Sequence, residues 1–258
     1  MTRCAGLAKP VETCPESAMK RWVLTAFAMV WGTTAAAGEV TVAVAANFLT
    51  TAEEIFADFE ASSGHSVTLT HGSTGQLFAQ IEFGAPFDIY LAADQERPGL
   101  LRANGKATRV DTYALGQLVL ASRVPVPVES AGEALAGRTV ALADPTVAPY
   151  GKAATTAMER LKLDTATFRP VLVSNVGQVG SVFVTGNADV AFVARSQLPL
   201  LDAPFVLDLD AILPGLPQDA AFLARAEDNP AAQDLWTWLF APETQARIKS
   251  AGYGVATE

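Results

Sequence analysis

The stretch that decides the fold is residues 67–81, which read Val-Thr-Leu-Thr-His-Gly-Ser-Thr-Gly-Gln-Leu-Phe-Ala-Gln-Ile. A short β-type run ends in two small hydroxyl residues, Ser73 and Thr74, which are flanked by glycines. Beyond them the apolar residues fall at helical spacing, at Leu77, Phe78 and Ile81. The pattern predicts a strand, a tight turn and a helix, with Ser73 or Thr74 at the helix cap.

A helix start of this kind has a chemical consequence. The first N–H groups of a helix have no partner within it, and the helix dipole adds a partial positive charge there. Such a turn can therefore hold an anion without any Lys or Arg. A cap that serves only its own helix is the alternative, and other helix starts pointing to the same place would argue against it.

The same unit occurs earlier in the chain. Residues 39–46 form a nearly continuous apolar run of strand length, and Asn47 follows them. The next helix is expected to bury Ala52, Ile55, Phe56 and Phe59. Thr50 or Thr51 is expected to begin that helix in a capping box with the glutamate three residues later.

Strand and helix patterns alternate through the remaining sequence. Strands are expected at residues 87–93, 115–121, 138–143, 171–173 and 188–194, and helices at residues 98–105, 153–161, 179–186 and 229–251. After residue 204 the pattern thins, and Pro214 and Pro217 bracket a predicted loop. The alternation predicts an α/β protein with mostly parallel sheets.

Four of the predicted turns have the same character, because each follows a strand and opens a helix. They are Ala46-Asn47-Phe48, Gly72-Ser73-Thr74-Gly75, Ala148-Pro149-Tyr150-Gly151 and Asn175-Val176-Gly177. In open α/β sheets, ligands bind at the carboxyl ends of strands, where such turns converge. Two turns come from each half of the chain, which predicts a cleft between two lobes.

The groups that these turns offer are an amide, hydroxyls and backbone N–H groups, without any formal positive charge. Such a set suits a compact oxyanion that is fully deprotonated, because every contact is a donor. A monoprotonated phosphate would also need an acceptor. Four ordinary helix caps in an enzyme of unknown type remain the alternative.

The composition limits the partners. The chain has 258 residues, a net charge of -9 and no basic run, which disfavours nucleic acid and anionic membrane surfaces as partners. Residues 1–38 are interpreted as a leader and signal peptide, with Met19 as the true start. A membrane-anchored helix is the alternative, but the apolar run is shorter than about 18 residues. Cys4 and Cys14 both precede this segment, so the mature chain is expected to have no disulfide and no thiol chemistry.

Patterns for catalysis and metal binding are weak. The two histidines, His65 and His71, are not accompanied by a third ligand at metal-binding spacing. The turn at 72–75 is not a nucleophile elbow, because its serine directly follows the glycine. We therefore assign no catalytic residue and no metal site. A secreted hydrolase or transferase that acts on phosphate or sulfate esters remains an alternative from a different class.

Several motifs occur together in one order and spacing. They are Val42-Ala43-Val44-Ala45-Ala46-Asn47-Phe48, Gly72-Ser73-Thr74-Gly75, Gly84-Ala85-Pro86-Phe87-Asp88, Ala148-Pro149-Tyr150-Gly151 and Ser174-Asn175-Val176-Gly177-Gln178. From about residue 40 to the C-terminus, the chain resembles the periplasmic molybdate-binding proteins of ABC transporters. The resemblance implies a two-lobed periplasmic binding protein of type II, in which each lobe is a mostly parallel sheet flanked by helices and the ligand cleft lies between the lobes. Lobe 1 would contain residues 39–116 and 217–258, and lobe 2 residues 117–216.

The resemblance also implies a function and a ligand set. The protein would be a periplasmic monomer without cofactor that captures molybdate or tungstate and delivers it to a permease in the inner membrane. By position, the oxyanion would be bound by Asn47, Ser73, Thr74, Tyr150 and Val176. Ala194 stands where one branch of the family has a binding tyrosine, so that contact would be absent. A binding protein for sulfate or another tetrahedral oxyanion is the closer alternative.

Overall fold

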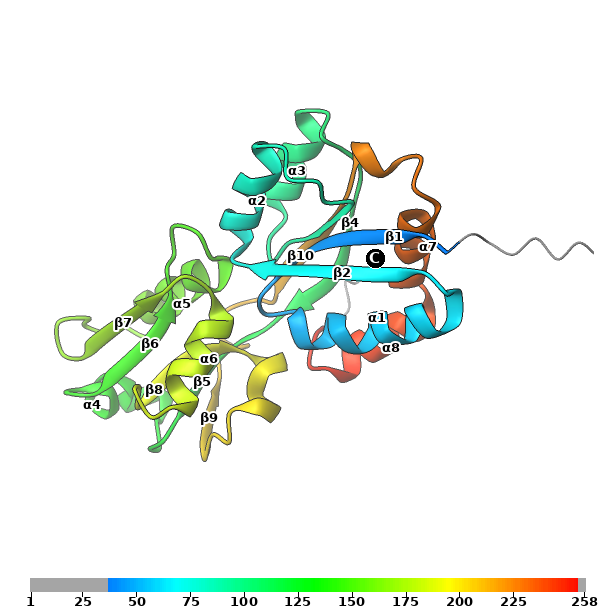
Figure 1. Ribbon diagram of the computed structural model, residues 1–258. Coiled ribbons are helices and arrows are strands. Elements are labelled where there is room, and N and C mark those ends of the chain that lie inside the picture. Colours follow the sequence, from blue (N-terminus) through cyan, green and yellow to red (C-terminus); the bar gives the residue numbers. More distant parts are fainter. Residues whose placement is uncertain (1–36, 255–258) are drawn as a thin grey trace, which may run out of the picture. The chain divides into compact units, whose positions relative to one another are not determined.

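The computed structural model describes residues 37–254, and its helices and strands are drawn in Figure 1. The leader and signal peptide predicted for residues 1–38 therefore lie almost wholly outside the described residues. None of the helices in the described part of the chain combines the length and apolar character needed to cross a bilayer.

The strands are β1 Glu39–Ala45, β2 Ser66–Gly72, β3 Ile89–Leu91, β4 Ala107–Gly116, β5 Leu118–Ser122, β6 Thr139–Ala143, β7 Arg169–Val173, β8 Val190–Ala194, β9 Phe205–Asp208 and β10 Leu216–Leu223. The α-helices are α1 Leu49–Ser63, α2 Thr74–Glu82, α3 Glu96–Ala103, α4 Ala131–Leu135, α5 Pro149–Arg160, α6 Val176–Val184, α7 Pro230–Leu239 and α8 Pro242–Ser250. The 3₁₀ turns are η1 Val128–Ser130, η2 Arg195–Leu200 and η3 Ala224–Ala226.

The strands form two five-stranded sheets. Sheet A has the order β2-β1-β3-β10-β4, and sheet B has the order β7-β6-β8-β5-β9. In sheet A, β1 is parallel to β2 and β3, whereas β10 is antiparallel to β3 and β4. In sheet B, β6 is parallel to β7 and β8, whereas β5 is antiparallel to β8 and β9. One strand in each sheet runs against the other four, so the predicted α/β class with mostly parallel sheets is confirmed.

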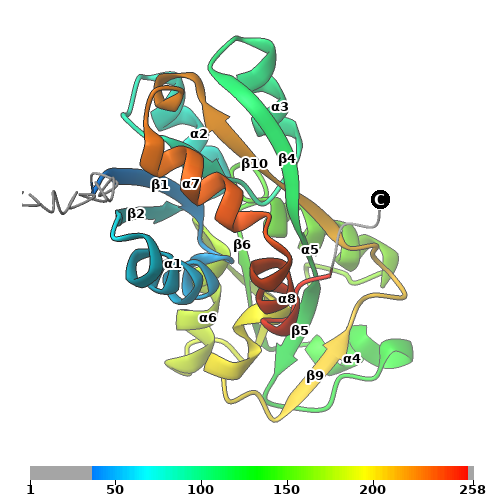
Figure 2. The same ribbon diagram turned by 90° about the vertical axis from the view of Figure 1, so that its right-hand side faces the viewer.

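Helices cover both faces of sheet A. Val42 and Val44 of β1 pack with α1, α7 and α8 in one core, and Figure 2 shows α7 lying across the strands. Ala43, the residue between them, belongs to a second core with Leu77 of α2 and Leu101 of α3. Successive side chains of a strand point to opposite faces, so burial on both faces produces the continuous apolar run of β1.

Sheet B has the same layered arrangement. Leu120 of β5 packs in a core with Ala154 of α5, whereas the adjacent Val119 packs in another with Val179 and Phe183 of α6. The chain passes from sheet A to sheet B through Gln117, between β4 and β5. It returns to sheet A between Asp208 and Leu216. Sheet B is thus built from one continuous segment, whereas sheet A is built from two.

Three local expectations were wrong. Helix α1 has no capping box at Thr50 or Thr51, because its N-cap is Phe48, two residues before Thr50, and no side chain caps the helix. The buried Phe48 ring packs edge-on against the rings of Tyr113 and Tyr253, at centroid distances of 4.8 and 5.3 Å, and this packing determines where the helix begins.

The other two errors concern strands. The single strand expected at residues 115–121 is divided by Gln117 between β4 and β5. The loop expected between Pro214 and Pro217 contains the start of β10, and β9 lies in the stretch after residue 204 where the sequence pattern thins. Proline lacks an N–H and is tolerated near a strand end, so Pro217 does not prevent β10 from lying inside sheet A.

Candidate oxyanion-binding site

A small cavity lies where the four predicted turns meet. Its volume is about 10 Å³, and it is lined by Ala45, Ala46, Asn47, Gly72, Ser73, Thr74, Ala93, Ala148, Pro149, Tyr150, Asn175 and Val176. These residues lie at or just after the carboxyl ends of β1, β2 and β3 of sheet A and of β6 and β7 of sheet B. All five residues proposed from the sequence are among them, and each is at most 4% exposed.

Two of the helix starts are capped by their own side chains. Ser73 accepts a hydrogen bond from the Gln76 N–H at 3.3 Å, and the Gln76 side chain accepts one from the Ser73 N–H at 3.4 Å. Asn175 accepts a hydrogen bond from the Gln178 N–H at 3.0 Å. The capping role predicted for Ser73 is therefore confirmed, and its hydroxyl oxygen is occupied by its own helix.

The backbone around the cavity offers donors that no protein group uses. Among residues 37–254, no acceptor is present for the backbone N–H groups of Asn47, Thr74, Tyr150 and Val176. Thr74, Tyr150 and Val176 lie in the first turns of α2, α5 and α6, where the helix dipole is positive. Buried N–H groups in proteins are nearly always paired, so four such groups at one cavity indicate a site for an acceptor ligand.

Thr74 is fixed in place by residues of sheet A. Its hydroxyl oxygen accepts a hydrogen bond from the Ala93 N–H at 3.2 Å, and its carbonyl accepts one from the Tyr90 hydroxyl at 2.8 Å. Because the Thr74 hydroxyl oxygen already accepts, its own proton is available for donation.

Asn47 takes part in a buried polar network. Its Nδ2 donates to Gln218 Oε1 at 3.0 Å and lies 3.3 Å from the Tyr253 hydroxyl, which in turn donates to the Asn47 carbonyl at 2.6 Å. Asn47 Oδ1 is buried and has no hydrogen-bond partner within residues 37–254. The amide donor expected from the sequence is thus engaged with Gln218, and the donor that Asn47 keeps free is its backbone N–H.

The network contains residues that the sequence did not single out. Gln218 of β10 and Tyr113 of β4 are fully buried, and neither was proposed as part of the site. Gln218 Nε2 donates to the Tyr150 hydroxyl at 3.2 Å, which connects strand β10 with helix α5. No local pattern could have identified Gln218, because its hydrogen-bond partners, Asn47, Tyr113 and Tyr150, are all distant in the sequence.

Burial keeps the phenols of this region neutral. Desolvation raises the pKa of Tyr150 well above its usual value, and the nearby Tyr253 hydroxyl adds to the rise, while the amide groups of Gln218 and Asn47 oppose it. Desolvation likewise raises the pKa of Tyr113, Tyr90 and Tyr253. Tyr150 is therefore a neutral hydrogen-bond donor over the whole physiological pH range.

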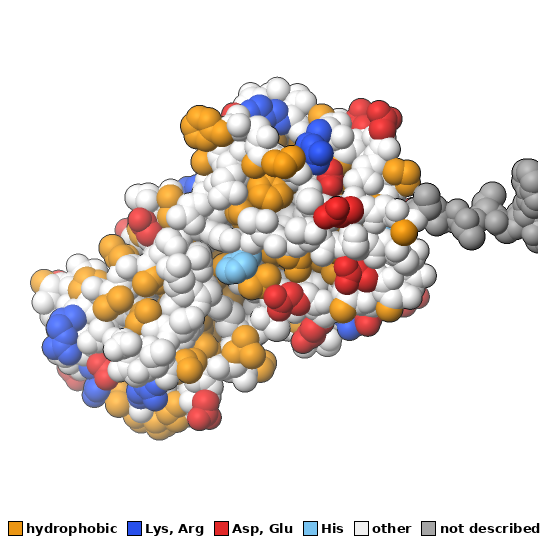
Figure 3. Space-filling model, in the orientation of Figure 1, with side chains coloured by type: hydrophobic (Ala, Val, Ile, Leu, Met, Phe, Trp, Pro, Cys, Tyr) orange, Lys and Arg blue, Asp and Glu red, His pale blue; other side chains and the backbone are white. Residues whose placement is uncertain are grey.

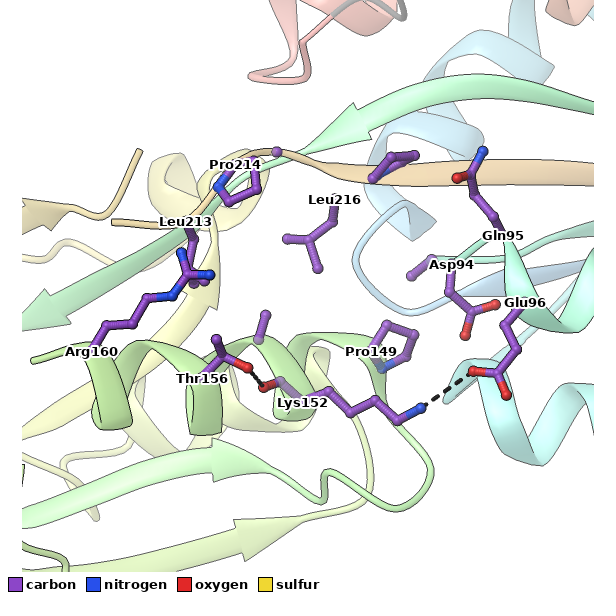
Figure 4. Close-up of a pocket in the computed structure, with 14 residues that line it drawn as sticks. Asp94, Gln95, Glu96, Pro149, Lys152, Thr156, Arg160, Leu213, Pro214 and Leu216 are labelled. Carbon is purple, nitrogen blue, oxygen red and sulfur yellow. Dashed lines mark hydrogen bonds and ion pairs between the residues drawn. The ribbon is translucent and has the colours of Figure 1, made fainter. Parts of the chain in front are cut away.

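A larger pocket adjoins the small cavity and shares Ala93 and Pro149 with it. Its volume is about 420 Å³, and Figure 4 shows Asp94, Glu96, Lys152 and Arg160 around it. The Lys152 ammonium lies 3.4 Å from the Glu96 carboxylate, and Asp94 is paired with the nearby Arg97. None of the five proposed binding residues lines this pocket, so size alone does not identify the site.

The described residues show no arrangement suited to a metal ion. Within residues 37–254, there is no group of three or more His, Asp or Glu side chains that could coordinate one. On the face drawn in Figure 3, Lys and Arg side chains are interspersed with Asp and Glu rather than gathered into a patch. The lining of the small cavity likewise contains no charged side chain.

Comparisons with known proteins find relatives along most of the chain. Residues 40–254 match the family model described as "Bacterial extracellular solute-binding protein". The chain is 37% identical to the molybdate-binding protein ModA of Azotobacter vinelandii, over 92% of this chain and 98% of that protein. It is 40% identical to the molybdate-binding protein ModA of Rhodobacter capsulatus, over 89% of this chain and 94% of that protein. The solved structure of the periplasmic molybdate-binding protein of Azotobacter vinelandii superimposes with a TM-score of 0.77 at 34% identity, over 84% of this chain and all of that chain.

The four tyrosines of the chain provide a test of the buried network. All four are at most 4% exposed, and the pKa of each is raised. We expect the folded protein to show no phenolate absorbance near pH 10, whereas the chain unfolded in guanidinium chloride titrates there. Stability from these groups is constant below about pH 10 and falls above it, because the unfolded chain then loses protons that the folded protein retains. A phenol that titrates normally in the folded protein would contradict the burial of this network.

Proposed function

Because the chain belongs to the bacterial extracellular solute-binding proteins, and within them to the molybdate-binding proteins of ABC transporters, we propose that its small cavity captures molybdate or tungstate. The anion is held by neutral donors and delivered to a permease in the inner membrane. The protein acts in the periplasm, as a monomer, and has no catalytic activity.

The observation that carries the proposal is the neutral donor set of the cavity. None of its lining residues is Lys, Arg, Asp or Glu, and four of them have backbone N–H groups without an acceptor in residues 37–254. A doubly charged oxyanion offers acceptors on every side and needs no proton acceptor from the protein. The partial charges of three helix starts balance part of its charge.

The size of the cavity supports a compact ligand. Pockets for drug-sized molecules are about 300–1,000 Å³, whereas this cavity is about 10 Å³ and its lining residues are almost fully buried. A drug-sized molecule therefore does not fit in this cavity. Molybdate, tungstate and sulfate share charge and shape, so size is the property by which a binding site can tell them apart.

Contacts between the two sides of the cavity support binding by closure. The Gly75 N–H, at the start of α2, donates to the Val147 carbonyl, before α5, at 2.8 Å. The Ser196 hydroxyl donates to the Asn47 carbonyl at 3.2 Å. In a protein whose two lobes, residues 39–116 with 217–258 and residues 117–216, close on a ligand, such bonds form only in the closed state.

Titration calorimetry with four anions tests the proposal directly. We expect sodium molybdate and tungstate to bind at least about 100-fold more tightly than sulfate and phosphate, a difference of about 2.7 kcal/mol. Phosphate is the sharpest comparison, because the buried Asn47 Oδ1 is an unpaired acceptor for the proton of a hydrogen phosphate. If sulfate or phosphate binds more tightly than molybdate, the assignment of molybdate as the ligand is wrong. Turnover of phosphate or sulfate esters would refute the proposal that the chain is a binding protein.

Thr74→Val tests the contact at α2. Valine keeps the shape of threonine but removes the hydroxyl, so the variant should lose about 1.5–3 kcal/mol of molybdate binding free energy, the usual value for a hydrogen bond to a charged group. Thr155→Val is the matched control, because the Thr155 hydroxyl bonds to the Gly151 carbonyl of its own helix and does not line the cavity. Equal affinities for the two variants, measured by calorimetry, would place the anion elsewhere.

Gly75→Ala tests closure without touching the anion. A Cβ at Gly75 would lie 2.8 Å from the Val147 carbonyl oxygen and 3.1 Å from its Cα, which is too close for the contact to persist. Overpacking of this kind costs about 1–3 kcal/mol, so molybdate affinity should fall about 5- to 150-fold. Gly99→Ala, where the added methyl meets nothing within 4 Å, should bind normally. Wild-type affinity in Gly75→Ala would mean that this contact is not part of the binding-competent state.

A further inference from the structure

We propose that Gln218 is a positioning residue that fixes the direction of the Tyr150 hydroxyl proton, so that Tyr150 donates into the cavity. Gln218 does not line the cavity and has no exposed surface. The inference rests on the proposed function, since the acceptor for the Tyr150 proton is the bound oxyanion.

The Gln218 amide is held in one orientation by its neighbours. The Asn47 Nδ2 donates to its Oε1 at 3.0 Å, and the Tyr113 hydroxyl lies 3.1 Å both from this oxygen and from the Ala92 carbonyl. Turning the amide over would bring its NH₂ group against the Asn47 NH₂ group, donor against donor. The buried amide therefore keeps its Nε2 directed at Tyr150, from which it is 3.2 Å away.

This orientation determines what Tyr150 can do. A phenol has one proton, and the Tyr150 oxygen already accepts from Gln218 Nε2. The Tyr150 proton has no acceptor of its own among residues 37–254, although the side chain is almost fully buried and lines the cavity. With its oxygen occupied on the Gln218 side, the hydroxyl is left as a pure donor toward the ligand.

The backbone at Gly116 leaves room for this hydrogen bond. A Cβ at Gly116 would lie 2.2 Å from Gln218 Nε2 and 2.4 Å from the Tyr150 hydroxyl oxygen. Gly116 is the last residue of β4, where the chain leaves sheet A, and it pairs with Leu216 of β10. The bond thus joins β10 of sheet A to α5, which covers sheet B, so Tyr150 is correctly oriented only when the two sides of the cavity are together.

Gln218→Glu tests the positioning role through the pH dependence of molybdate affinity. A residue with only a structural role would not change this pH dependence. A carboxylate cannot donate to Tyr150 and would accept its proton instead, so molybdate affinity at neutral pH should fall about 10- to 100-fold. The pKa of a buried Glu can rise to about 8–9, so the carboxyl regains a donor as the pH is lowered through that range. We therefore expect the affinity of the variant to recover between about pH 9 and 6, while that of the wild type stays constant.

Two comparisons complete the experiment. Gln233→Glu makes the same charge change on α7, away from the cavity, and should leave affinity and its pH dependence unchanged. In a double-mutant cycle, Gln218→Met and Tyr150→Phe should be non-additive, because Gln218 acts through the Tyr150 hydroxyl. Urea unfolding shows whether Gln218→Glu is folded. If it is not, the double-mutant cycle alone tests whether Gln218 acts through the Tyr150 hydroxyl.

The outcomes separate this inference from the proposed function. If the wild type binds no molybdate, the proposed function fails and this inference fails with it. If the wild type binds molybdate but Gln218→Glu follows the wild-type pH profile, or the cycle is additive, Gln218 does not orient Tyr150. A recovering profile together with non-additivity supports the assignment.

Discussion

Everything at the site depends on one constraint, which is that buried N–H groups must find acceptors. Asn47, Thr74, Tyr150 and Val176 each leave a backbone N–H unused by the rest of residues 37–254, and all four lie at one small cavity. An unpaired buried donor costs about 1–3 kcal/mol, so a fold that gathers several of them is suited to a ligand that accepts from all sides. The unpaired backbone N–H is the chemical property that the turns after β1, β2, β6 and β7 share.

This constraint also explains how an acidic protein can hold an anion. The chain carries a net charge of -9, yet the cavity is lined by neutral groups, and the acidic side chains beside it, Asp94 and Glu96, are paired with Arg97 and Lys152. Fixed dipoles in a buried site need no reorganisation when the ligand arrives and are weakly screened by salt. The fold therefore binds the anion through oriented donors at contact distance and not through electrostatic attraction at long range.

The parts of the structure that the sequence predicts are those encoded by adjacent residues. The strand–turn–helix unit around Ser73 is local, because the cap, the glycines and the apolar spacing all lie within a few residues. The convergence of four such turns follows from the rule for parallel strands. The prediction of Thr50 or Thr51 as a helix cap failed because the packing of Phe48 against Tyr113 and Tyr253, rings that are distant in sequence, decides where α1 begins. Gln218 could not be predicted for the same reason, since all its partners come from other elements.

The position of β10 has a consequence for the order in which the chain can fold. β10 lies between β3 and β4, although about 100 residues separate it from β4 in the sequence, so sheet A cannot complete its pairing until the whole sheet B segment has been made. Sheet B is built from one continuous segment and needs no later strand. Contacts between distant segments form slowly because a long loop must close first. During synthesis, the half of the molecule that starts first is thus the half that is finished last, and β3 and β4 present open edges until β10 arrives between them.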